Sequence, residues 1–191
     1  MKKNLIFALV CATLTLTGCD KIKDVTSRDF TVKNITFDFT TETDEAPVTL
    51  MSGSTEATLR SGTMSSFTVT RTVDISEMGS SEIIEYANKI SKVQIEGTTM
   101  NVTAIPSGSY NIANLTITAA DVPGSLAIPS YILGGTFTPP ANMDTYTTAF
   151  IMRVLSAKQV SVTVSGQSDA PPGTTLNISY KSDILFTASL F

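Results

Sequence analysis

Carboxylate side chains are the groups in this sequence with the clearest capacity for chemistry. Glu42, Asp44 and Glu45 fall within four residues, and paired carboxylates can act as acid and base or bind Ca²⁺ through their oxygens. The EF-hand spacing does not occur, and short acidic runs usually lie in solvent. The sequence therefore predicts no metal site and no cofactor. A hydrolase that uses carboxylates alone stays open as an alternative.

Other common catalytic groups are missing from the sequence. The 191 residues include no His, which excludes a Ser-His-Asp arrangement and an imidazole metal site. Neither a GxGxxG sequence nor a Walker-type phosphate loop occurs. These observations predict no catalytic residues and a protein that is not an enzyme.

A long stretch rich in Pro and Gly, residues 121–144, is the best candidate for a binding loop. It contains Tyr131 and Phe137, and long irregular segments often carry function. If the stretch binds a glycan or a lipid, these two side chains are the candidates to line its pocket. The alternative is a plain crossover between two sheets.

The start of the chain has the pattern of an export signal. Lys2 and Lys3 precede an uncharged, mainly apolar run over residues 5–16, and Cys19 follows shortly after it. A permanent membrane-spanning helix needs about 20 apolar residues, so this run is too short for one.

The sequence Leu16-Thr17-Gly18-Cys19 closes the signal and resembles the lipobox of bacterial lipoproteins. The resemblance implies that the thiol of Cys19 is diacylated and the peptide is cut before Cys19. It also implies that the new amino terminus is acylated, usually with palmitate-type chains, which anchors the chain to a membrane. The layout also resembles small envelope lipoproteins of the Bacteroidota. We therefore expect a protein of the cell envelope, most simply of the outer membrane. Both the periplasmic face and the surface face of that membrane are compatible with the sequence.

Length and composition indicate one exported domain. We expect a signal peptide over residues 1–18, a lipidated N-terminus and flexible spacer over 19–29, and a single domain over 30–191. Cys11 leaves with the signal and Cys19 carries lipid, so no cysteine remains for a disulfide. The net charge of −4 argues against nucleic acid as a partner.

Short alternating apolar segments predict an all-β fold, an antiparallel β-sandwich of the immunoglobulin type or a related one. The alternation changes phase near residues 33–34 and 113–114, which predicts bulges. The nearly continuous apolar run over residues 147–155 predicts a central strand buried on both faces. Alternation over residues 184–190 predicts an integral C-terminal strand.

One short helix is predicted near residues 80–91. Ser80 and Ser81 are candidate caps, and Ile83, Ala87 and Ile90 fall at i, i+4 and i+7 on one apolar face, which Ile84 would widen. About ten residues do not form a stable helix alone, so we expect this face to pack on the sheet.

The sequence thus favours a lipid-anchored, non-enzymatic binding or assembly module. Its expected partners are the membrane, through Cys19, and another envelope protein. A glycan- or lipid-binding surface protein and the carboxylate-only hydrolase are the alternatives.

Overall fold

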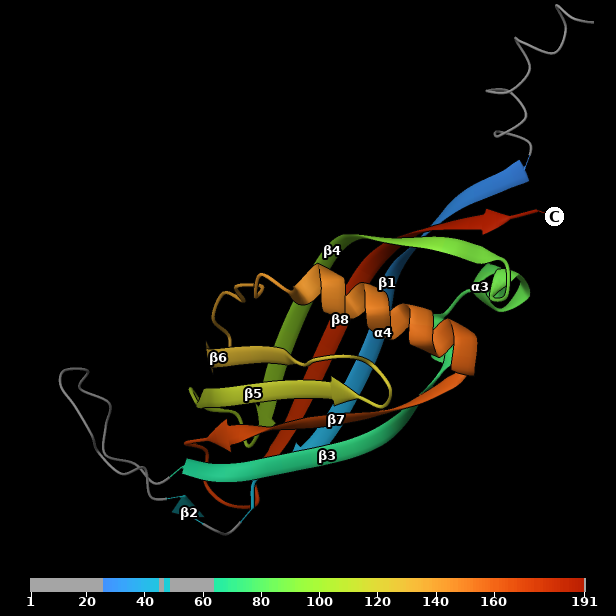
Figure 1. The fold of residues 1–191 in the computed structure, drawn as a ribbon. Coiled ribbons are helices and arrows are strands. Elements are labelled where there is room, and N and C mark those ends of the chain that lie inside the picture. Colours follow the sequence, from blue (N-terminus) through green and yellow to red (C-terminus); the bar gives the residue numbers. More distant parts are fainter. Residues whose placement is uncertain (1–25, 45–46, 49–63, 191) are drawn as a thin grey trace, which may run out of the picture.

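Two antiparallel sheets face each other in the computed structural model, which describes residues 26–44, 47–48 and 64–190. Figure 1 shows the sheets as two layers whose strands cross. One sheet has three strands in the order β1-β8-β4, and the other has five in the order β2-β3-β7-β5-β6. The all-β sandwich expected from the sequence is confirmed.

Strand β8 (Thr175–Ser189) lies in the middle of the three-stranded sheet, between β1 (Ser27–Glu42) and β4 (Ile90–Ile105). Its even-numbered residues, Leu176 to Ala188, are all buried, while the odd-numbered ones face outward. This alternation confirms the integral C-terminal strand. Strand β1 begins at Ser27, three residues before the domain start expected at residue 30, because Ser27 pairs with Ser189.

The five-stranded sheet is built from β2 (Pro47–Val48), β3 (Met64–Asp74), β7 (Gln159–Ser168), β5 (Asn111–Ala119) and β6 (Leu126–Ile132). Among the described residues β6 pairs with β5 alone, so it forms an edge of the sheet. Apolar residues also predict short strands over residues 48–51 and 57–60, and these lie almost entirely outside the described residues.

Bulges occur at both positions where the alternation of apolar and polar residues changes phase. The pairing of β1 with β8 shifts between Val32 and Ile35, and that of β5 with β7 shifts between Ala113 and Thr116. Asn34 and Asn114 have φ angles of 56° and 53° at these points, in the left-handed region that Asn tolerates better than most residues. Both predicted bulges are confirmed.

The helix predicted near residues 80–91 is present only in its first half, as α3 (Ser81–Tyr86), because β4 already begins at Ile90. The 3₁₀ helix η1 (Ile75–Met78) precedes it. Ile83, Ala87 and Ile90 are buried as expected, although Ile90 belongs to β4. Ile84 does not widen the packed face, because 52% of its surface is exposed. Ser80 occupies the N-cap position without a side-chain cap hydrogen bond.

Replacing Ile83 with Ala should destabilise the domain by about 2–5 kcal/mol, the usual cost of emptying a buried Ile site. Ile83 is fully buried, and its neighbours cannot all move into the space. The matched control is Ile84→Ala on the exposed face, which should change the free energy of unfolding by less than about 0.5 kcal/mol. Equal denaturant midpoints for the two variants would show that α3 does not pack as described.

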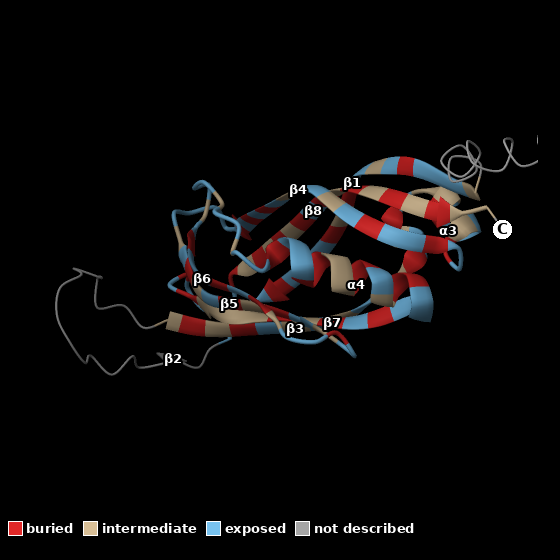
Figure 2. Cartoon of the chain, turned by 45° about the horizontal axis from the view of Figure 1, so that its top comes forward, coloured by how far each residue is buried: buried red, intermediate tan, exposed pale blue. Residues whose placement is uncertain are grey.

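The central strand expected over residues 147–155 is wrong, because this segment lies in helix α4 (Met143–Ala157). Figure 2 shows α4 between the two sheets, and seven of its residues are buried. The rings of Phe150 and Phe37 meet edge to face, 5.3 Å apart between centroids. A continuous apolar run does not separate a buried helix from a buried strand, and here the helix fills one open side of the sandwich.

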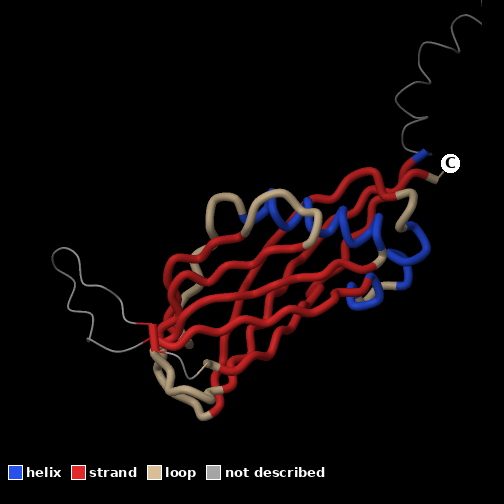
Figure 3. The backbone as a smooth tube through the Cα atoms, turned by 60° about the horizontal axis from the view of Figure 1, so that its bottom comes forward, coloured by secondary structure: helices blue, strands red, loops and turns tan. Residues whose placement is uncertain are grey.

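The sandwich has two distinct ends, which can be followed in Figure 3. At the α3 end, Arg28 near the start of β1 forms an ion pair of 2.6 Å with Glu82, and the N–H of Leu190 donates to the carbonyl of Thr26. At the far end, the N–H of Thr43 just after β1 donates to the carbonyl of Thr174. The 16 residues of β1 correspond to about 50 Å of strand between these ends.

Candidate functional site

An open groove of about 450 Å³ lies between the edge strand β6 and the returning segment 136–140. Strand β6, which forms one of its walls, lies at the end of the sandwich away from α3 in both Figure 1 and Figure 2. All of its lining residues are uncharged: Ala127, Ile128, Pro129, Ser130, Tyr131, Thr136, Phe137, Thr138, Pro139 and Pro140. We call this the β6 groove.

Strand β6 forms one wall of the groove. Nothing in the described chain pairs with its outer edge, so this edge is free to border the groove. Pro129 fits such a strand, since proline lacks an N–H and is tolerated mainly at sheet edges. The chain then turns back: the N–H of Gly135 donates to the carbonyl of Ile132 at 2.8 Å. Gly134 in this turn has a φ of 76°, which favours glycine.

The opposite wall is segment 136–140, which is held by the start of α4. The N–H of Met143 donates to the carbonyl of Pro140 at 3.0 Å, and Asn142 Nδ2 donates to the carbonyl of Ser125. The two prolines restrict the backbone before the helix. The groove walls are therefore fixed at both ends by backbone hydrogen bonds.

The structure brings together the two residues that the sequence nominated. The ring centroids of Tyr131 and Phe137 are 6.4 Å apart and the rings lie edge to face. Tyr131 is buried and supports the groove floor, with its hydroxyl 3.5 Å from the carbonyl of Gly135. Phe137 is half-buried and offers more of its ring to a ligand.

Sequence reasoning missed the hydroxyl groups of the groove and strand β6 itself. Ser130, Thr136 and Thr138 give the groove polar positions beside the two rings. The signal for β6 was the alternation of Leu126 and Ile128, but Pro129 and the surrounding glycines concealed it. The expectation that residues 121–144 are irregular is therefore wrong for seven of them, which form the regular strand β6.

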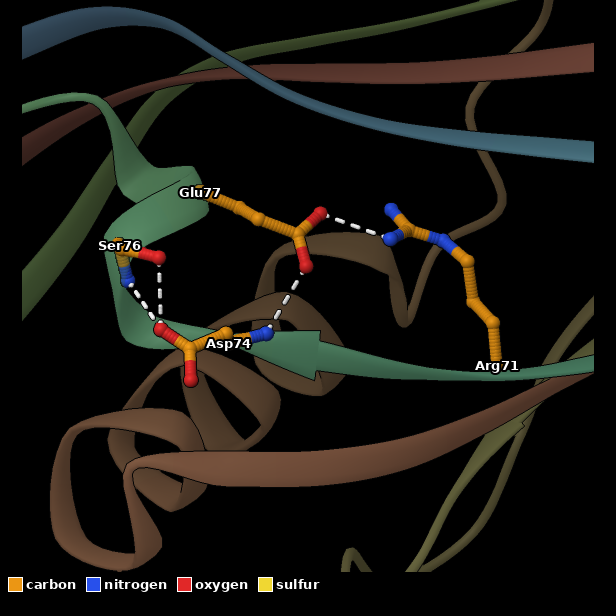
Figure 4. Close-up of polar contacts among 4 residues, drawn as sticks. All are labelled: Arg71, Asp74, Ser76 and Glu77. Atoms are coloured by element: carbon orange, nitrogen blue, oxygen red, sulfur yellow. Dashed lines mark hydrogen bonds and ion pairs between the residues drawn. The ribbon is translucent and has the colours of Figure 1, made fainter.

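A second cluster contains the carboxylates of Asp74 and Glu77 (Figure 4). Glu77 Oε2 receives a hydrogen bond of 2.7 Å from Arg71, and Oε1 accepts from the N–H of Asp74. Asp74 in turn accepts from the N–H and hydroxyl of Ser76, which keeps the pKa of Asp74 below its ordinary value. Both acids are used as the capping box of η1, so this arrangement is structural.

Arg71 also contacts the three-stranded sheet. Its guanidinium carbon lies 4.9 Å from the centroid of the Phe39 ring, on the neighbouring edge strand β1. The contact joins the two sheets on the side opposite α4.

The acidic run nominated as an ion site is only partly described. Glu42 and Asp44 are exposed, and Asp44 Oδ2 accepts a hydrogen bond of 3.4 Å from Ser66. Glu45 lies outside the described residues. Within the described ranges no group of three or more acidic or Cys side chains is placed to hold a metal ion.

Buried hydroxyl groups connect α4 to the three-stranded sheet. Thr147 forms hydrogen bonds with Tyr180 and with the carbonyl of Met143. Burial raises the pKa of Tyr180, and it raises the pKa of Tyr146 to about 12, so both phenols stay neutral near pH 7. The cavity beside them, about 20 Å³, has room for roughly one water molecule.

Comparisons with known proteins identify no family for this chain. No family model matches it, and no curated protein does. A solved chain from Desmodium yellow mottle tymovirus is similar at 10% identity and a TM-score of 0.23, with 86% of this chain and 84% of that chain covered. A likeness this weak carries no argument. Among the described residues no helix is long and apolar enough to span a membrane.

Proposed function

We propose that this chain is an exported lipoprotein, anchored through Cys19, whose sandwich binds a neutral ligand in the β6 groove without converting it. The observation that carries the binding role is the groove itself, which is about 450 Å³ in volume and has two aromatic rings and three side-chain hydroxyls on its walls. Small-molecule sites typically measure 300–1,000 Å³ and combine apolar surface with a few polar groups.

The charge of the lining restricts the ligand class. Every side chain of the groove is uncharged, so a charged ligand group would lose water without gaining an opposite charge, which is costly. The lining hydroxyls can both donate and accept hydrogen bonds. A neutral molecule with hydroxyl groups and an apolar face therefore fits best.

A neutral saccharide meets this description better than an acyl chain. Sugar rings have an apolar face that can lie on the exposed part of Phe137, and their hydroxyl edges can reach Ser130, Thr136 or Thr138. A lone acyl chain would leave the three hydroxyls of the groove without partners. None of the lining side chains carries a carboxylate, so we expect the saccharide to be held and not cleaved.

The binding test compares two single substitutions. Phe137→Ala removes the exposed ring and should weaken binding of neutral oligosaccharides about tenfold, since aromatic contacts contribute roughly 0.5–1.5 kcal/mol beyond their buried area. Ile132→Ala is the matched control, because Ile132 ends the same strand, is exposed and does not line the groove. Titration calorimetry of the mature protein against a panel of neutral oligosaccharides measures both affinities.

Several results of this comparison would contradict the proposed function. If no neutral oligosaccharide binds, the saccharide proposal is wrong, and binding of a fatty acid instead would select the lipid alternative. Equal affinities for wild type and Phe137→Ala, with unchanged melting temperatures, would place the ligand outside the groove. Release of shortened sugars during the titration would overturn the non-enzymatic role.

A further inference from the structure

The α3 end of the sandwich carries an exposed apolar side chain close to the proposed anchor. Four large apolar side chains are exposed in the described part of the chain: Ile84, Ile105, Ile132 and Met152. Of these, Ile84 is on α3, the element that contacts the start of β1 through Arg28 and Glu82. The inner face of α3 is buried, so Ile84 points away from the core.

Chain length limits how far this end can lie from the membrane. Six residues lie between Cys19 and Thr26, the first described residue. Whatever their conformation, they span at most about 25 Å. The α3 end therefore stays close to the lipid headgroups, whereas the far end, about 50 Å away along β1, reaches them only if the sandwich lies flat.

We propose that the α3 end rests on the lipid bilayer, with Ile84 inserted among the headgroups and the β6 groove held away from the membrane. This inference depends on the proposed lipid anchor at Cys19. A tether of this length gives a local concentration in the millimolar range, so even one apolar side chain is enough for frequent contact.

The surroundings of Ile84 fit an interface with neutral lipid. Tyr86 and Arg28 lie at the same end of the sandwich, with the guanidinium 5.9 Å from the centroid of the Tyr86 ring, and such amphipathic side chains suit the headgroup layer. The charged side chains around α3 have both signs, Arg28, Lys89 and Lys92 against Glu82 and Glu85, so the contact does not depend on anionic lipid alone.

The absence of Trp from the sequence makes the test direct. Ile84→Trp and, as the matched control at the far end, Ile105→Trp each introduce a single Trp into the full-length lipidated protein. Each variant is reconstituted into phosphatidylcholine vesicles with or without brominated phosphatidylcholine. We expect blue-shifted emission and strong bromine quenching for Ile84→Trp, and neither for Ile105→Trp. Glu85→Trp, on the same exposed face, replaces Ile84→Trp if that variant melts early.

The possible outcomes distinguish the orientation of the sandwich on the bilayer from the lipid anchor at Cys19. If the protein floats with the vesicles but the Trp at position 84 is not quenched, the anchor stands and the orientation is wrong. Equal quenching at both positions would show a sandwich lying flat and would also contradict the proposal. A blue shift that depends on protein concentration and not on lipid would assign the surface to a second copy of the chain. Failure to float would refute the anchor and this inference together.

Discussion

Deletion of residues 184–191 is expected to abolish cooperative folding of the whole domain. The segment forms the second half of β8, which pairs with β1 on one side and β4 on the other. Its side chains Ile184, Phe186 and Ala188 are fully buried. Losing Ile184 and Phe186 alone removes contacts that cost about 2–5 kcal/mol each, against a total stability of about 5–15 kcal/mol. The deletion would also leave unpaired edges on β1 and β4, which promote aggregation.

Thermal melting and solubility of the truncated protein measure this effect. A milder pair of variants provides the control: Phe186→Ala empties a core site, whereas Leu185→Ala changes the opposite, half-exposed face of the same strand. We expect the first to lower the melting temperature strongly and the second only slightly. A soluble truncated protein with the wild-type melting transition would show that β8 is dispensable, contrary to its central place in the sheet.

Substitution of Cys19 by Ser should eliminate lipid attachment. The thiol is the proposed acylation site, and stable anchoring requires at least two acyl chains, because one gives only marginal binding. We therefore expect Cys19→Ser to lose acyl labelling and to accumulate as unprocessed precursor or as soluble protein. Metabolic labelling with an alkyne fatty acid and membrane fractionation measure both effects.

Cys11→Ser is the natural control for this experiment. Cys11 lies inside the apolar run of the signal, so its substitution should leave labelling and membrane partition unchanged. Labelling that persists in Cys19→Ser, or is lost in Cys11→Ser, would contradict the anchor.

The strand framework could be predicted because alternation has a direct physical cause. Successive side chains of a strand point to opposite faces, so the apolar residues at even positions of β8 marked a strand with one buried face. A change of phase requires an extra residue, and the bulges at Asn34 and Asn114 occur where the phase changed. Helical spacing also marked Ile83, Ala87 and Ile90 as buried, but only Ile83 lies within α3; Ala87 is its C-cap and Ile90 begins β4.

Helix α4 could not be separated from a strand by hydrophobicity alone. It is inserted between two sheets, and its residues 149–155 are apolar at every position except Arg153. Its helical spacing is visible afterwards in Met143, Thr147, Phe150 and Val154, which are all buried. Which interpretation is right depends on the space that the two sheets leave open, a property of the whole fold.

The candidate site was predictable only in part. An aromatic pair in a Pro/Gly-rich segment indicated Tyr131 and Phe137, and their rings do meet. The groove also needs the free edge of β6 and the return of segment 136–140 along it. Those features depend on strand order, which the sequence does not display.

The most direct test of the binding role is to observe the two groove rings while ligand is added. With ¹³C-labelled Phe and Tyr, the NMR signals of Phe137 and Tyr131 should shift in a saturable manner as a neutral oligosaccharide is titrated into the mature protein. The signals of Phe30 and Tyr86, which lie at the α3 end, should stay unchanged. Saturable shifts at Phe30 and Tyr86 with no change at Phe137 and Tyr131 would contradict the account and move the ligand to the opposite end of the sandwich.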